Sequence, residues 1–259
     1  MCAAGATSTV YPTTNGEDVA FIVANSGSRV VIAENQTQVD KLVDRRSEIP
    51  AVEKVVIIDG TGDGDWVITL EDLEQSGKQL LADSPNAVTE RVEAIRPDQL
   101  ATLIYTSGTT GKPKGVRLTH QAWTYTASAL DSLGVLSDKD LNYLWLPLAH
   151  SFGKVLLSLQ LQVGFVTAVD GRVPKIVENL PTVQPTFMAA VPRIFEKVYS
   201  KVAQTALSEG GAKAKIFTWA FKVGIEAAEK ELAGEKVGGG LAFKRSIADP
   251  VTKLIHAAQ

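Results

Sequence analysis

Short apolar runs alternate with segments of helical periodicity along most of the chain. Residues 14–17 are typical of a helix start, and apolar residues then recur at helical spacing as far as residues 25–27. The apolar run over residues 29–33 has the length of a buried strand. The same order recurs downstream, with further strands expected at residues 55–59, 103–105, 115–119, 141–146, 165–169 and 186–190. Such alternation predicts an α/β fold built from βαβ units, with a mainly parallel sheet.

Three other stretches complete this pattern. Residues 69–94 hold two polar helical segments separated by residues 84–86, which indicates an exposed connection. Beyond Arg193 the apolar residues keep helical spacing, and three glycines at residues 238–240 interrupt the helices. Residues 60–65 resemble part of a calcium loop, but the downstream glutamate and the spacing of an EF-hand are missing. We therefore expect a turn at residues 60–65.

The most informative segment is a polar loop between two of the expected strands. It contains hydroxyl groups, glycines and lysines at Thr106, Ser107, Gly108, Thr109, Thr110, Gly111, Lys112 and Lys114. Glycines permit positive φ angles that turn successive N–H groups toward one point, and the hydroxyl and ammonium groups add further donors. The loop is therefore expected to hold a polyanion such as a nucleotide phosphate chain.

This loop differs from the common phosphate-binding loops. Thr106 stands where a Walker A loop needs its first glycine, and Pro113 follows Lys112 where a Ser or Thr belongs. The glycine spacing also fails the dinucleotide-binding pattern. A hairpin turn rich in Ser, Thr and Gly is the structural alternative, and for Lys112 an exposed turn lysine is an equally good interpretation.

Composition limits the classes of partner and the compartment. The chain has 259 residues, 45% of them hydrophobic, and a net charge of −3 without a basic block, which argues against nucleic acid. A single cysteine, Cys2, fits a reducing compartment, and the first residues lack the pattern of a signal peptide. The most apolar run, residues 155–169, is too short and too polar to span a bilayer. A cytoplasmic protein with at most peripheral membrane contact is expected.

Residues 105–116 resemble the phosphate-binding signature of the adenylate-forming enzymes, which include acyl-CoA synthetases and luciferases. Residues 145–150 resemble the segment that places an aromatic or His residue against the acyl substrate in that superfamily. Residues 191–199 resemble the long-chain fatty acid branch, and residues 5–13 and 26–29 its bacterial members. The resemblance implies part of the family's large α/β domain, with mainly parallel sheets flanked by helices and without the small C-terminal domain. Within it we divide the chain into residues 1–94 and residues 95–259.

The activity implied by this resemblance is the AMP-forming activation of a long-chain fatty acid with ATP, followed by transfer to coenzyme A. The resemblance assigns phosphate binding to the polar loop, with Thr106 as a Mg²⁺ ligand and Lys114 favoured over Lys112. It places His150 on the acyl side, although a hydrogen-bonded histidine at a strand end is the alternative. No residue of the chain is assigned a certain catalytic role. Aromatic and aliphatic residues after His150 could line an acyl tunnel, but ordinary core is preferred.

Some segments of the family pattern are not found in these 259 residues, and this leaves other functions possible. These segments include Tyr-Gly-x-Thr-Glu, which supplies a second Mg²⁺ ligand, and the Thr-Gly-Asp that holds the ribose. The chain is therefore expected to be part of a ligase, inactive alone, with the remainder of the ligase as a partner. Two other functions stay open: a non-catalytic module that binds nucleotide or acyl-CoA, and adenylation of another carboxylic acid.

Overall fold

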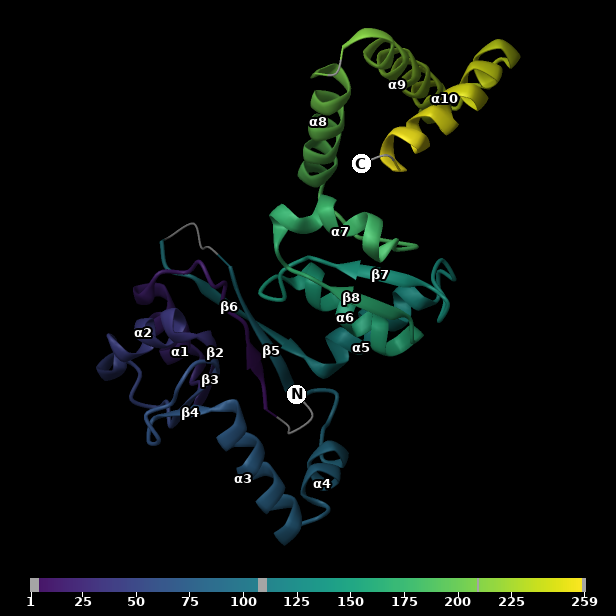
Figure 1. Cartoon of the computed structure of the whole chain (residues 1–259). Coiled ribbons are helices and arrows are strands. Elements are labelled where there is room, and N and C mark those ends of the chain that lie inside the picture. The colour runs from purple at the N-terminus through teal and green to yellow at the C-terminus, as the bar shows by residue number, and fades with distance from the viewer. Residues whose placement is uncertain (1–4, 107–110, 209, 258–259) are drawn as a thin grey trace. The chain divides into compact units, whose positions relative to one another are not determined.

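The computed structural model describes residues 5–106, 111–208 and 210–257, and it shows the α/β fold expected from the sequence (Figure 1). The chain divides into two compact units, Met1–Gly171 and Arg172–Gln259. The first contains the sheets and the polar loop, and the second is helical. This division is made by packing and does not test the boundary at residues 94–95 expected within the large domain.

The first sheet is parallel and has the strand order β2-β3-β4. Its strands are β2 (Val30–Asn35), β3 (Lys54–Asp59) and β4 (Val67–Thr69). Helix α1 (Gly16–Ser26) precedes β2 along the chain, and α2 (Gln36–Val43) and the short 3-10 helix η1 (Arg46–Glu48) connect β2 to β3. Asn15 caps α1 by accepting a hydrogen bond from the Asp18 N–H, and Gly27 ends it with a φ of 65°. Apolar residues of both helices and one sheet face form a buried core.

Trp66 joins this core to the turn that precedes β4. Its side chain is 5% exposed, and its Nε1 donates a hydrogen bond to the Val52 carbonyl oxygen at 3.0 Å. The Asp63 carboxylate accepts hydrogen bonds from the N–H groups of Asp65 and Val67 at 2.8 and 2.9 Å, and these bonds lower the pKa of Asp63. Because the carboxylate closes its own loop, the turn expected at residues 60–65 is confirmed.

The second sheet carries the polar loop and has the strand order β1-β5-β6. Its strands are β1 (Thr7–Ser8), β5 (Leu100–Thr106) and β6 (Lys114–Thr119), and the chain reaches β5 through α3 (Leu70–Asp83) and α4 (Ala87–Glu93). Strands β1 and β5 are parallel, whereas β5 and β6 are antiparallel. Helix α5 (His120–Asp131) follows β6, and Nε1 of its Trp123 donates a hydrogen bond to the Thr102 hydroxyl at 3.1 Å.

A third, two-stranded parallel sheet contains β7 (Leu141–Leu144) and β8 (Val166–Val169), which helix α6 (Ser151–Val163) connects along the chain. This strand–helix–strand unit is the one in which His150 lies. Helix α6 also packs toward the second sheet, because its Val155 contacts a buried cluster of Ala101, Ile104 and Trp123. The loop that begins α6 is therefore held between secondary-structure elements of two sheets.

The second unit consists of η2 (Val173–Lys175), α7 (Ile176–Val183), α8 (Pro192–Ser208), α9 (Gly211–Leu232) and α10 (Gly239–Ala257). Helices α9 and α10 pack through Ala220, Val223 and Ala248. The helices expected beyond Arg193 are confirmed. The strand expected at residues 186–190 is wrong, since only Phe187 makes a β-bridge. A short apolar run fits a buried strand or buried coil equally well, and pairing decides between them. In the part of the chain described, no helix is long and apolar enough to cross a membrane.

Candidate functional site

Thr106 and Lys114 face each other across the mouth of the polar loop. Thr106 is the last residue of β5, Lys114 is the first of β6, and the two are register partners in the antiparallel pair. Side chains of directly opposed residues lie on the same face of the sheet, with Cβ atoms about 4.5–5.5 Å apart. Both residues are exposed. The structure thus brings together a hydroxyl and an ammonium group, whereas residues 107–110 lie outside the described residues.

A neighbouring pair, Tyr105 and Gly115, fixes the end of β5. A Cβ at Gly115 would lie 3.0 Å from Cζ of the Tyr105 ring, so glycine lets the ring lie across β6. The Tyr105 hydroxyl donates a hydrogen bond to the Asn25 Oδ1 of α1 at 2.7 Å. Partial burial raises the pKa of Tyr105, and a hydrogen bond with Ser26 opposes that rise. The hydroxyl therefore stays protonated as a donor, and β5 is anchored to α1 directly before Thr106.

The two lysines of the loop have different surroundings. The Lys112 Nζ lies 5.4 Å from the ring centroid of Phe21 on α1, which is a cation–π contact. Lys114 instead lies opposite Thr106. Lys112 thus contacts helix α1, whereas Lys114 is the register partner of Thr106. The hydroxyl of Thr106 and the ammonium group of Lys114 form the described part of the candidate phosphate site.

His150 is the N-cap residue of α6, where its Nδ1 accepts a long, weak hydrogen bond of 3.5 Å from the Phe152 N–H. The loop before it is tied to β1, because the Thr9 hydroxyl donates to the Leu148 carbonyl oxygen at 2.7 Å. Strand β1 runs parallel to β5, with Ser8 beside Leu103. The loop therefore lies at the carboxyl end of β1 and β5, the same end as Thr106. Open α/β sheets bind ligands at that end.

Lys154 is a residue that sequence reasoning did not assign to the site. It lies in the first turns of α6, close behind His150, and is only 9% exposed. Burial lowers the pKa of Lys154, and no carboxylate opposes this shift. Within the residues that the structure describes, its ammonium group has no hydrogen-bond or ion-pair partner. The sequence feature that could have identified Lys154 is its place within the largely apolar residues 152–159.

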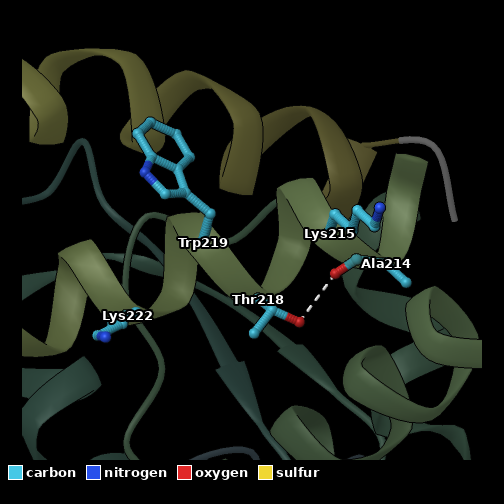
Figure 2. A pocket seen from close by; sticks show the side chains of 5 residues that line it. All are labelled: Ala214, Lys215, Thr218, Trp219 and Lys222. Carbon is cyan, nitrogen blue, oxygen red and sulfur yellow. Dashed lines mark hydrogen bonds between the residues drawn. The ribbon is translucent and has the colours of Figure 1, made fainter. Parts of the chain in front are cut away.

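Other candidate positions lie outside this site or belong to the core. Among the aromatic and aliphatic residues considered for an acyl tunnel, Leu156, Leu159 and Phe165 are buried as core residues, whereas Phe152 and Val191 are exposed. The hollow shown in Figure 2 lies on α9 of the second unit and is lined by Ala214, Lys215, Thr218, Trp219 and Lys222. None of the residues predicted from the sequence lines it. Among the described residues, no group of three or more His, Cys, Asp or Glu side chains could hold a metal ion.

The family model for the AMP-binding enzymes matches residues 1–243, so the chain belongs to that family. This confirms the resemblance to the adenylate-forming enzymes. The long-chain-fatty-acid–CoA ligase FadD15 of Mycobacterium tuberculosis is 30% identical over 240 residues, covering 90% of this chain and 37% of that ligase. The human long-chain-fatty-acid–CoA ligase ACSBG2 is 27% identical over 234 residues, covering 87% of this chain and 34% of the ligase. The chain thus spans about a third of the length of the curated relatives it matches.

Solved structures support the same fold at lower identity. The long-chain-fatty-acid–CoA ligase FadD1 of Archaeoglobus fulgidus has a TM-score of 0.57 at 21% identity, over 76% of this chain and 37% of that one. The adenylation domain of a Mycobacterium chelonae carboxylate reductase has a TM-score of 0.58 at 20% identity, over 81% of this chain and 35% of that one. These matches confirm that the fold is that of part of an adenylate-forming enzyme.

Proposed function

We propose that the chain supplies the phosphate-binding and acyl-side residues of an AMP-forming long-chain fatty acid–CoA ligase. The observation that carries this proposal is the pairing of Thr106 with Lys114 at the carboxyl end of β5, the end at which His150 also lies. The names of the similar ligases support a long-chain fatty acid as the substrate and coenzyme A as the acceptor. In the reaction, a fatty acid carboxylate oxygen attacks the α-phosphorus of ATP and pyrophosphate leaves. The thiol of coenzyme A then attacks the acyl carbon, and AMP leaves.

The residues of this chain act mainly by binding and charge neutralisation. Lys114 compensates negative charge on the triphosphate, which increases on the departing pyrophosphate. The Thr106 hydroxyl suits Mg²⁺, a hard cation that usually takes one or two protein oxygens together with phosphate oxygens. A single exposed hydroxyl fits such a site because the nucleotide brings most of the ligands. When bound, the ion neutralises phosphate charge.

Replacing Thr106 or Lys114 by alanine is expected to weaken binding of ATP·Mg²⁺ by the chain. Each loss removes a hydrogen bond to a charged group, worth about 1–3 kcal/mol, or roughly 5- to 150-fold in Kd. The measurement is isothermal titration of the 259-residue chain with ATP·Mg²⁺. Lys112→Ala is the matched control, since its ammonium group contacts Phe21, and it should change the affinity less than Lys114→Ala. Equal ATP affinity in wild type and both site variants would refute the phosphate-site assignment.

Replacing His150 by alanine is expected to weaken palmitate binding and to leave ATP·Mg²⁺ affinity unchanged, because His150 is assigned to the acyl side. Alanine also removes the cap of α6, so His150→Asn is the control that can still cap the helix. Palmitate binding should fall in both variants if the imidazole itself contacts the substrate. Normal binding by the asparagine variant would reduce His150 to a helix cap.

These tests use binding because the chain spans about a third of the length of its curated relatives. That span favours a second possibility for the polypeptide taken alone, namely binding of nucleotide or acyl substrate without turnover. Coupled release of AMP on adding ATP, palmitate and coenzyme A to the 259-residue chain would exclude this second possibility.

A further inference from the structure

Lys154 is largely buried for a lysine whose charge has no partner among the described residues. Its side chain is 9% exposed and belongs to helix α6, whose neighbouring positions Val155, Leu156 and Leu159 are apolar. Burial of a charge is unfavourable unless the charge is paired or lost. Among the described residues no acceptor or carboxylate pairs with this group.

The N-terminal end of helix α6 makes a positive charge at Lys154 still less favourable. Lys154 is the fourth residue of α6, and the first turn of that helix contains no acidic residue. The N-terminal end of a helix carries partial positive charge, which repels a cation and attracts an anion. Gly153 holds this turn close to the preceding loop, since a Cβ there would lie 2.5 Å from the Pro147 carbonyl oxygen. Lys154 and the helix N-terminus therefore both contribute positive charge to the first turns of α6, where the first turn holds no acidic residue.

We propose that Lys154 binds the carboxylate of the apolar acyl substrate and orients it at the start of α6, where His150 lies. This assignment rests on the proposed function and adds a specific binding residue to it. A carboxylate supplies the single negative charge that the described residues around Lys154 lack. The phosphates of ATP are more highly charged and are assigned to Thr106 and Lys114 at the exposed strand ends. Palmitate carries a carboxylate and no phosphate, so its binding tests the site at Lys154 separately from the ATP site.

The test compares the 259-residue chain with its Lys154→Met and Lys154→Arg variants. Methionine keeps the length of the side chain without the charge, and arginine keeps the charge. Lys139→Met is the matched control at an exposed position. For each protein, the measurements are the Kd values of palmitate, 1-hexadecanol and ATP·Mg²⁺, and the melting temperature with and without palmitate.

Lys154→Met should weaken palmitate binding by roughly tenfold or more, the loss expected for a charge-assisted hydrogen bond. It should leave the affinities for 1-hexadecanol and ATP·Mg²⁺ unchanged, and Lys154→Arg should retain palmitate binding. Without ligand, the methionine variant should melt at a higher temperature than wild type, because an unpaired charge on a largely buried side chain has been removed. Palmitate should raise the melting temperature of wild type more than that of the methionine variant. Lys139→Met should behave as wild type throughout.

The possible failures can be told apart. If wild type and Lys154→Met bind palmitate equally well, the inference is wrong and the proposed function stands. If Lys154→Met instead weakens ATP·Mg²⁺ binding alone, the group binds the nucleotide and the inference is also wrong. If wild type binds ATP·Mg²⁺ but not palmitate, the acyl part of the proposed function fails, and the role of Lys154 fails with it. If Lys154→Met lowers the melting temperature, palmitate affinities are compared at a temperature at which all three proteins are folded. Tighter palmitate binding by wild type and Lys154→Arg than by Lys154→Met then still supports the inference, and equal binding contradicts it.

Discussion

Replacing Trp66 by alanine is expected to lower the free energy of unfolding by about 3–5 kcal/mol, the usual cost of removing a large buried aromatic side chain. The indole fills part of the core beneath the β2-β3-β4 sheet and is 5% exposed. The substitution also leaves the Val52 carbonyl oxygen without the donor Nε1, and it removes the contact with Arg46, whose Cζ lies 4.5 Å from the ring centroid. Urea unfolding followed by far-UV circular dichroism measures the change.

Trp219→Ala provides the control for this effect. Trp219 lies on α9 and is 38% exposed, so the same truncation should leave the unfolding of the first unit unchanged within about 0.5 kcal/mol. A similar, small change at both positions would mean that Trp66 does not anchor the turn before β4 to the core. A large loss at Trp66 alone would support the packing described.

Replacing Gly153 by valine is expected to destabilise the chain by about 3 kcal/mol, the upper end of the usual cost of overpacking. A Cβ at this position would lie 2.5 Å from the Pro147 carbonyl oxygen and 2.9 Å from that of Leu146. Both atoms belong to the backbone, so a side-chain rotation cannot relieve the contact, and the first turn of α6 must move. Because this turn carries His150 and Lys154, palmitate binding should weaken as well.

Gly77→Val is the matched control, because Gly77 is also helical, on α3, and a Cβ there would meet no atom within 4 Å. We expect its free energy of unfolding to stay within about 0.5 kcal/mol of wild type, with palmitate affinity unchanged. Both variants are measured by urea unfolding and by palmitate titration. Equal stability of the two variants would show that α6 can shift away from the loop at little cost.

Local sequence signals predicted most of the elements, because periodicity and capping act over a few residues. The start of α1 follows from the Asn15 cap and its end from Gly27. Composition predicts a polyanion-binding loop after β5, and the family that residues 105–116 resemble is confirmed. The strand expected at residues 186–190 failed because an apolar run does not specify its own pairing partner.

The sequence by itself determined the α/β class, most of the longer elements and the family, since these depend on local pattern and on a long motif. Only the tertiary structure decided which loop residues face each other. Strand register places Lys114 opposite Thr106, and packing against α1 places Lys112 over Phe21. Burial likewise distinguishes Lys154 from an ordinary surface lysine, because exposure depends on helices and strands that are distant along the chain. Side-chain surroundings of this kind arise from long-range packing, which no short stretch of sequence encodes.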